Sequence, residues 1–400
     1  MQFKTFDIVP HGTNFDFVGK RKIALILSTL FNLAVILWSL PQVHGLDYGV
    51  DFAGGTEMQV RFDRNVDPGE VRKNIEALGF KDASVQTYGP ESEHTYLVRV
   101  GRVALLTPED AARIIAAVKA KFPVVGTPAF SPEVGDKIDF EFQVLPSSAE
   151  LQGVVESAGV KVREIREEAG LTAGTKALAV LTQGIQDRVE KELSARFADA
   201  KPQVLRVEYV GPAVGRELRN QGFKAILYAM ALIVVYVGLR FDFRFSPGVI
   251  IAILHDAIIT LGYFAFSGRE FNLTSVAVIL TVVGYSVNDT VVVYDRIREN
   301  LKKYRRMPMA ELLDLSVNET LSRTIVTTLS LLITLVALLV LGPNVIFGFT
   351  AAITLGIFVG TYSSIYMAAP ILMWLKVTSN SFVQAETEIE RQERLARERS

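Results

Sequence analysis

Six apolar runs constrain the fold of this chain more than any other feature. A transmembrane helix needs about 20 consecutive, mostly apolar residues. The six runs occupy residues 23–40, 223–239, 247–266, 273–293, 324–341 and 347–375. Residues 41–222 contain no comparable run, and only 21% of all residues are charged. We therefore predict an α-helical membrane protein with six spans and one folded aqueous domain, residues 41–222, between the first and second spans.

The positive residues of the short loops predict how the spans are oriented. Lys and Arg gather on the cytoplasmic side of membrane proteins. In this chain they precede span one and follow spans two, four and six, at Lys20, Arg21, Lys22, Arg240, Arg244, Arg296, Arg298, Lys302, Lys303, Arg305, Arg306 and Lys376. The opposite loops contain only Arg269, and residues 342–346 are uncharged. Both termini are therefore predicted to be cytoplasmic and the large domain extracytoplasmic.

The first run has the basic flank of a signal peptide, but two features favour an uncleaved helix. Residues 1–22 precede it, and no small-x-small cleavage site follows Pro41. We predict a cytoplasmic segment at 1–22, transmembrane helix 1 at 23–40, helices 2–6 within 223–375 and a cytoplasmic tail at 376–400.

Composition excludes several classes of function. The chain has no cysteine, which rules out disulfides, cysteine-ligated metals and thiol catalysis. Its net charge of −1 gives no case for nucleic-acid binding. The aqueous domain has no recognisable nucleophile, metal cluster or phosphate loop. We therefore expect binding and not catalysis, with no enzyme activity, cofactor or metal.

The aqueous domain alternates strand-like and helix-like segments. Strands are predicted at 57–62, 83–87, 96–100 and 204–210, and helices at 67–78 and 107–122. Both helices have a capping residue followed by proline at the first turn, Asp67 with Pro68 and Thr107 with Pro108.

The same pattern recurs within the domain. Eighty residues apart, the matching pairs are Phe62 with Phe142, Val71 with Leu151, Ile75 with Val155 and Gly79 with Gly159. We interpret this as two related α+β units, about 45–125 and 126–222, each similar to a ferredoxin-like split β-α-β fold. Coincidence between two amphipathic stretches is the alternative.

Two glycine-rich motifs bracket the domain. Residues 47–56 read DYGVDFAGGT, and residues 211–218 read GPAVGREL. Paired glycines permit a tight turn or a close backbone approach, and Gly-Pro ends a strand before a helix. We predict a structural motif at the base of the domain, formed by Asp51, Phe52, Gly54, Gly55, Thr56, Gly211, Pro212 and Gly215.

These motifs, in this order with six spans, resemble the SecF family. The resemblance extends to LHD at 254–256, GYSVNDT at 284–290, YDRIREN at 294–300 and SRT at 322–324. It implies a helical bundle like one half of a transporter of the RND superfamily. The aqueous domain is about twice the size usual in this family, which agrees with the internal repeat.

Ionisable residues inside the spans are candidates for function. On insertion scales such a residue costs about 2.5–3.5 kcal/mol at the centre of a helix. His255 and Asp256 lie in the third span, Asp289 lies in the fourth, and Arg323 precedes the fifth. From the helical rise, Asp289 is about 6 Å and Asp256 about 13 Å from the inner end of its span. Moving the permanently charged Arg323 relative to Asp289 would change whether Asp289 holds a proton.

The resemblance assigns proton conduction to Asp289 and Arg323. A static polar clamp between helices is the alternative. For His255 and Asp256, proton transfer and simple helix packing both stay open.

The resemblance implies an auxiliary subunit of the Sec protein translocase in the bacterial inner membrane. Its domain would be periplasmic, and its partners would be SecD, the Sec channel with its other auxiliary subunits, unfolded preprotein and lipid. With SecD it would use proton flow to promote preprotein translocation. Half of an RND small-molecule exporter is the alternative. An intramembrane protease is excluded because neither HExxH nor GxGD surrounds the buried acids.

Overall fold

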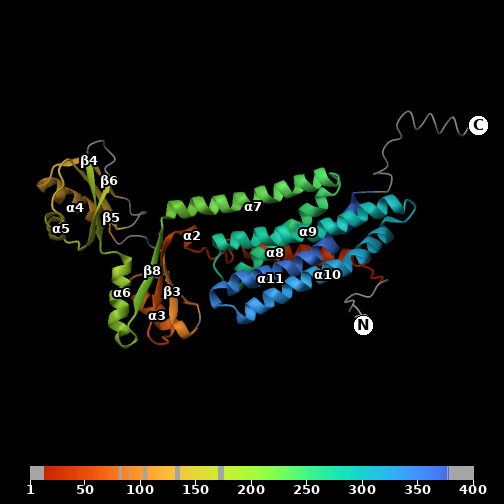
Figure 1. Cartoon of the computed structure of the whole chain (residues 1–400), viewed down its shortest axis with the longest axis horizontal. Helices are drawn as coiled ribbons and strands as arrows, with labels where there is room; N and C mark the ends of the chain where they lie inside the picture. The colour runs from red at the N-terminus through yellow and green to blue at the C-terminus, as the bar shows by residue number, and fades with distance from the viewer. Residues whose placement is uncertain are drawn as a thin grey trace, which may run out of the picture. The chain divides into compact units, whose positions relative to one another are not determined.

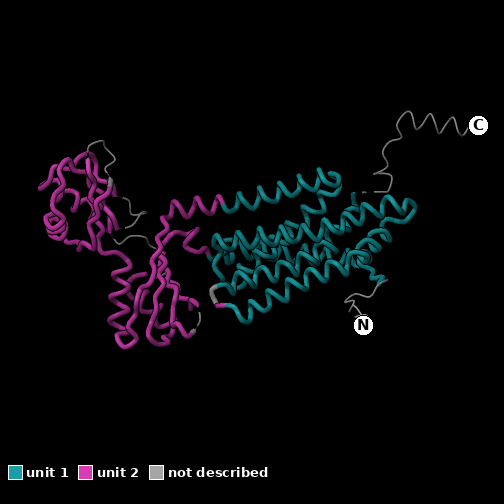
Figure 2. The backbone as a smooth tube through the Cα atoms, in the orientation of Figure 1, with its two compact units in different colours: residues 1–47, 222–342, 346–400 teal, residues 48–221, 343–345 magenta. Residues whose placement is uncertain are grey.

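The computed structural model describes residues 13–80, 83–89, 91–101, 106–130, 136–169, 175–375 and 377. Its contacts divide the chain into two compact units, coloured teal and magenta in Figure 2. Unit 1 comprises Met1–Asp47, Gly222–Gly342 and Ile346–Ser400, and unit 2 comprises Tyr48–Gln221 and Pro343–Val345. The predicted tail at 376–400 lies outside the described residues, apart from Val377.

Unit 1 is a bundle of long helices, and the prediction of six spans is confirmed. Five spans are continuous helices: α1 (Arg21–Trp38), α7 (Pro212–Arg240), α8 (Ser246–Ser267), α9 (Leu273–Lys303) and α10 (Met309–Leu341). The last span consists of α11 (Asn344–Ser363), a π-helical turn (Ser364–Ala368) and α12 (Ala369–Trp374) (Figure 1). Several helices extend beyond the apolar runs, because backbone hydrogen bonds continue where the side chains become polar.

The spans differ in how deeply they are buried within the bundle. Over their apolar windows α8 and α9 are each 56% buried, whereas α1 and α10 are each 17% buried. The last span packs closely on α9 at two glycines. A Cβ atom on Gly356 would lie 2.3 Å from Val282 Cγ2, and one on Gly360 would lie 3.0 Å from Ser286 Cβ. Helices α8 and α9 therefore form the centre of the bundle.

Unit 2 contains two antiparallel four-stranded sheets. The first has the order β2-β3-β1-β8, from β1 (Gly55–Arg61), β2 (Ser84–Tyr88), β3 (Thr95–Val100) and β8 (Gln203–Val210). The second has the order β4-β5-β7-β6, from β4 (Val124–Phe130), β5 (Lys137–Phe142), β6 (Val162–Ala169) and β7 (Lys176–Thr182). The segments predicted within 57–122 and at 204–210 are observed to within two residues at each end.

Each sheet, together with the helices packed on it, forms one lobe of unit 2. Four helices complete the two lobes, and local sequence explains where three of them begin. These are α3 (Pro68–Ala77), α4 (Pro108–Lys121), α5 (Ser148–Ser157) and α6 (Ile185–Arg196). Asp67 caps α3, while Thr107 with Asp110 and Ser147 with Glu150 form capping boxes at α4 and α5. Such caps satisfy backbone N–H groups that lack partners in the first turn.

Core packing in unit 2 does not follow the order of the chain. Helix α4 follows β3, but its Ile114 and Val118 lie in the core of the second sheet. Helix α6 follows β7, but its Val189 and Leu193 lie in the core of the first sheet. The chain thus leaves the first lobe after β3, builds the second and returns through α6. The predicted duplication, with units at 45–125 and 126–222, stays a prediction.

Candidate functional site

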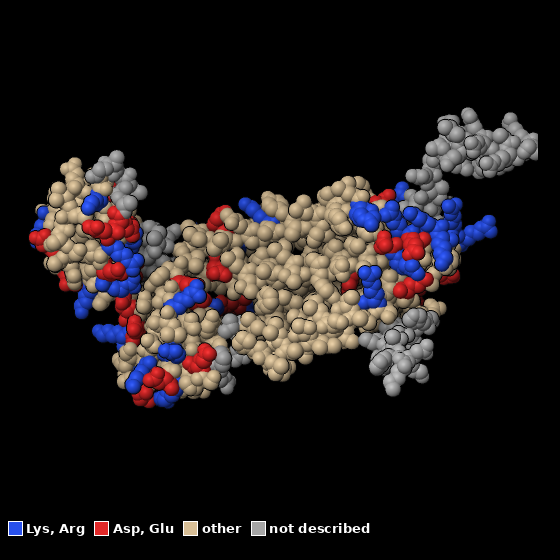
Figure 3. All heavy atoms as spheres, in the orientation of Figure 1, with Lys and Arg blue, Asp and Glu red and all other residues tan. Residues whose placement is uncertain are grey.

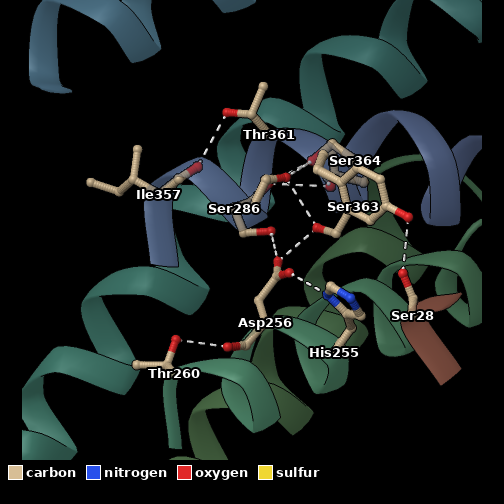
Figure 4. A network of polar contacts seen from close by, with 12 residues as sticks. Ser28, His255, Asp256, Thr260, Ser286, Ile357, Thr361, Ser363 and Ser364 are labelled. Atoms are coloured by element: carbon tan, nitrogen blue, oxygen red, sulfur yellow. Dashed lines mark hydrogen bonds and ion pairs between the residues drawn. The ribbon is translucent and has the colours of Figure 1, made fainter. Parts of the chain in front are cut away.

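Asp256 is the centre of a buried polar network in the bundle (Figure 4). It lies on α8 and is 0% exposed, while its neighbour His255 is 2% exposed. The Oδ1 atom of Asp256 lies 2.9 Å from Nδ1 of His255. Its Oδ2 atom accepts hydrogen bonds from Ser286 Oγ of α9 at 2.5 Å and from Ser363 Oγ of the last span at 2.8 Å. Every side-chain oxygen of Asp256 therefore has a partner, as a buried carboxyl requires.

Asp289 forms a second buried centre on α9, where it is 2% exposed. Its Oδ2 atom accepts a hydrogen bond from Thr361 Oγ1 of the last span at 3.3 Å. Thr361 Oγ1 in turn lies 3.0 Å from Thr328 Oγ1 of α10. Arg323 is exposed on α10, and no ion pair joins it to Asp289 in the described part of the chain. The structure thus groups His255 with Asp256 but does not pair Arg323 with Asp289.

Three hydroxyl side chains that were not predicted as site residues bond the two carboxyls: Ser286 on α9, and Thr361 and Ser363 on the last span. Thr290 on α9 and Ser364 on the last span bond each other beside them. Ser364 Oγ lies 2.8 Å from Thr290 Oγ1 and donates to the Ser286 carbonyl at 3.3 Å. The run TYSS at 361–364, inside an otherwise apolar span, was the available signal. Among the described residues, no group of three or more His, Asp or Glu could hold a metal ion.

A π-helical turn, Ser364–Ala368, begins at the last of these hydroxyl residues. Its sequence cause is Pro370, which has no N–H and whose ring clashes with the carbonyl four residues earlier, that of Tyr366. The Tyr294 hydroxyl of α9 donates to the Ala368 carbonyl at 3.0 Å. Gly248 makes this possible, because a Cβ atom there would lie 2.0 Å from the Tyr294 hydroxyl oxygen. Turns of this kind occur frequently at functional sites.

The glycines of the predicted base motif interlock in unit 2. Gly54 has φ +80° and ψ 168°, a conformation that is essentially restricted to glycine. A Cβ atom on Gly54 would lie 2.8 Å from Pro212 Cα, and one on Gly215 would lie 3.0 Å from the Phe52 carbonyl oxygen. Gly55 has φ +133°, and a Cβ atom there would lie 2.5 Å from the Val100 carbonyl oxygen. The backbones of the two motifs therefore approach too closely for side chains.

The other residues of the base motif surround these glycines. Asp51 and Phe52 lie in the short helix α2 (Val50–Ala53), where Phe52 is 1% exposed. Thr56 is 0% exposed on β1, and the Gly211 carbonyl accepts from the Gly215 N–H at 2.9 Å as α7 begins. The two motifs thus bring together the segments where the chain enters unit 2 and where it leaves it.

Comparisons with known proteins agree with this architecture. Residues 43–66 match the SecD/SecF GG motif model, and residues 189–378 match the model of the SecD/SecF C-terminal region of protein export membrane proteins. The protein translocase subunit SecF of Magnetococcus marinus is 36% identical, with 94% of this chain and 96% of the relative covered. SecF of Rickettsia typhi is 32% identical, covering 93% of this chain and 95% of the relative.

A solved structure also resembles this chain. The crystal structure of SecDF, a translocon-associated membrane protein from Thermus thermophilus, is similar with a TM-score of 0.63 at 31% identity. The match covers 92% of this chain but 39% of that chain, so this chain spans about two-fifths of SecDF. From its sequence relatives and its fold, the chain belongs to the SecF family of membrane proteins.

Proposed function

We propose that this SecF family member is an auxiliary subunit of the Sec protein translocase and works together with SecD. The observation that supports this is the 36% identity to a protein translocase subunit over 94% of the chain. The similar SecDF chain is longer, and this chain accounts for 39% of it. A separate SecD subunit would supply the remainder. In this role the protein would assist preprotein transport and would catalyse no covalent reaction of its own.

The arrangement of charge supports a place in the bacterial cytoplasmic membrane, with unit 2 in the periplasm. Lys and Arg gather at the end of unit 1 that contains the α9–α10 connection, while its apolar middle is nearly free of charge (Figure 3). By the positive-inside rule this end faces the cytoplasm, together with both termini.

We further propose that unit 1 conducts protons and that this flow drives translocation. Asp256 and Asp289 are buried in apolar helices, where an ionised carboxylate is costly, and each is within hydrogen-bond reach of hydroxyl groups. His255 adjoins Asp256, and Arg323, which forms no ion pair with Asp289 in the described part of the chain, would have to move to form one. One charge moving through 100 mV releases about 2.3 kcal/mol, enough to drive a conformational step. The step would reach unit 2 through the two base motifs.

The test measures late, gradient-dependent preprotein translocation in inverted membrane vesicles that contain SecD and this chain. We expect Asp289→Asn to remove most of the increase caused by the proton gradient, because an amide cannot exchange a proton. Asp63→Asn on the surface of unit 2 is the matched control. A variant Asp289→Asn with unchanged gradient dependence would refute the proton role. A stable, active complex without SecD would refute the subunit assignment.

A further inference from the structure

Four consecutive residues of the last span contact four other spans. Thr361 contacts Asp289 of α9 and Thr328 of α10, as described above. The Tyr362 hydroxyl lies 3.0 Å from Ser28 Oγ of α1 and donates to the Ala24 carbonyl at 3.2 Å. Ser363 donates to Asp256 of α8, and Ser364 lies beside Thr290 of α9. Successive residues of a helix point about 100° apart, so one turn can reach neighbours on all sides.

This segment, residues 361–364, supplies a hydrogen bond to each of the two buried carboxyls. Thr361 donates to Asp289 Oδ2 and Ser363 donates to Asp256 Oδ2. The carboxyls lie on different helices, but their donors are two residues apart on one helix. A change at either carboxyl therefore acts on the same short piece of backbone.

Both donors have a second acceptor within their own helix. Thr361 Oγ1 lies 3.3 Å from the Ile357 carbonyl oxygen (Figure 4), and Ser363 Oγ lies 3.0 Å from the Gly360 carbonyl oxygen. A hydroxyl has one proton to donate, so it serves either the carboxyl or the backbone carbonyl at a given moment. Each hydroxyl thus has at least two defined acceptors, and Thr361 has a third in Thr328 Oγ1 at 3.0 Å.

Protonation of a carboxyl selects between these acceptors. Oδ2 of Asp256 faces two hydroxyl donors, Ser286 and Ser363. An ionised oxygen accepts from both, but a protonated Oδ2 carries its own hydrogen and must donate it. One serine hydroxyl then has to turn away, and the Gly360 carbonyl is the acceptor available to Ser363.

The π-helical turn allows residues 361–364 to rotate when a carboxyl changes its protonation. It begins at Ser364, immediately after the two donors, and its hydrogen bonds span one residue more than those of an α-helix. Its conversion into a regular turn would rotate the residues on one side of it by about 100° relative to the other. The Tyr294 hydroxyl bonded to Ala368 stabilises the present form.

We propose that residues 361–364 couple the proton occupancy of Asp289 to that of Asp256, with Thr361 and Ser363 as positioning residues whose hydroxyls switch acceptors. This inference rests on the proposed proton conduction. It differs from a static polar clamp, because a clamp requires the hydrogen bonds but no exchange between two acceptors.

The test combines transport with infrared spectroscopy of the complex with SecD in vesicles. The variants are Thr361→Val, Ser363→Ala and Thr361→Ser, which keeps the hydroxyl. Thr354→Val is the matched control, because the Thr354 hydroxyl donates to the Thr350 carbonyl of its own helix. We expect Thr361→Val and Ser363→Ala to lose most of the gradient-dependent translocation, and Thr361→Ser and Thr354→Val to retain it.

Infrared difference spectra separate coupling from simple packing. We expect Asp289→Asn to shift the carboxyl band assigned to Asp256 in the otherwise native protein, and to cause no shift when Ser363→Ala is also present. A shift of equal size in both backgrounds would overturn the coupling. If Asp289→Asn itself leaves translocation fully gradient-dependent, the proton role fails. If it abolishes that dependence while Thr361→Val and Ser363→Ala behave like Thr354→Val, only the present inference fails.

Discussion

At the scale of single residues, glycine matters most where two backbones meet. Gly54 combines a glycine-restricted conformation with contact to the Pro212 backbone. The atoms nearest to the missing Cβ of Gly54 all belong to the backbone, so they cannot move aside as the end of a flexible side chain can. The base motif is therefore a rigid joint between the start of unit 2 and the start of α7, which suits a junction that transmits force.

We predict that Gly54→Ala destabilises the protein by more than about 1–3 kcal/mol, the usual cost of a residue held in such a backbone region, since a steric clash adds to it. Thermal unfolding of the purified full chain in detergent measures the effect. Gly153→Ala is the control, because Gly153 lies within α5 with no atom near its missing Cβ. Equal melting temperatures for Gly54→Ala and the wild type would contradict the rigid joint.

At the scale of helices and strands, the unexpected feature is that the first lobe is discontinuous in sequence, with α4 packed in the second lobe and α6 in the first. The second lobe is inserted between β3 and α6, so the first lobe closes only when α6 and β8 arrive. Its stability therefore depends on residues more than a hundred positions after β1. Helix α4, in contrast, belongs to the lobe whose strands β4 to β7 directly follow it.

This packing predicts which lobe each core substitution weakens. Leu193→Ala on α6 removes a fully buried side chain, at a cost of about 2–5 kcal/mol. Hydrogen–deuterium exchange should rise in β1 and β3 and stay unchanged in β5 and β7.

The reciprocal substitution Ile114→Ala on α4 should raise exchange in β5 and β7 only. Exchange that rises in β5 and β7 for Leu193→Ala would instead place α6 in the second lobe.

At the scale of the whole molecule, function depends on which way the chain crosses the membrane. In the proposed orientation, the basic residues at one end of unit 1 mark the cytoplasmic side, and the alternation of the six spans extends this to both termini. Unit 2, inserted between the first two spans, would then be on the opposite side of the membrane from Lys302.

The absence of cysteine allows a direct measurement of this topology. A single cysteine in Lys302→Cys should react with a membrane-impermeant maleimide in inverted vesicles but not in intact spheroplasts. Glu109→Cys, at the exposed start of α4, should show the reverse. Detergent permeabilisation should make both sites reactive. Labelling of both from the same side would contradict the predicted orientation.

The sequence by itself was sufficient for the number of spans, their predicted direction, most elements of the first lobe and the two buried acids. These features depend on local quantities: the length of an apolar run, the charge beside it, a capping residue, or an ionisable group inside a span. The same is true of the paired glycines, whose spacing alone indicated a close backbone approach.

Only the tertiary structure decided which side chains serve the acids. Ser363 is separated from Asp256 by 107 positions, and Thr361 from Asp289 by 72. No local pattern identifies such partners, because helix rotation and packing determine them. For the same reason the exposure of Arg323, the packing of α4 in the second lobe and α6 in the first, and the bond from Tyr294 to the π-helical turn could not be predicted from the sequence. Each depends on contacts between elements that are distant along the chain.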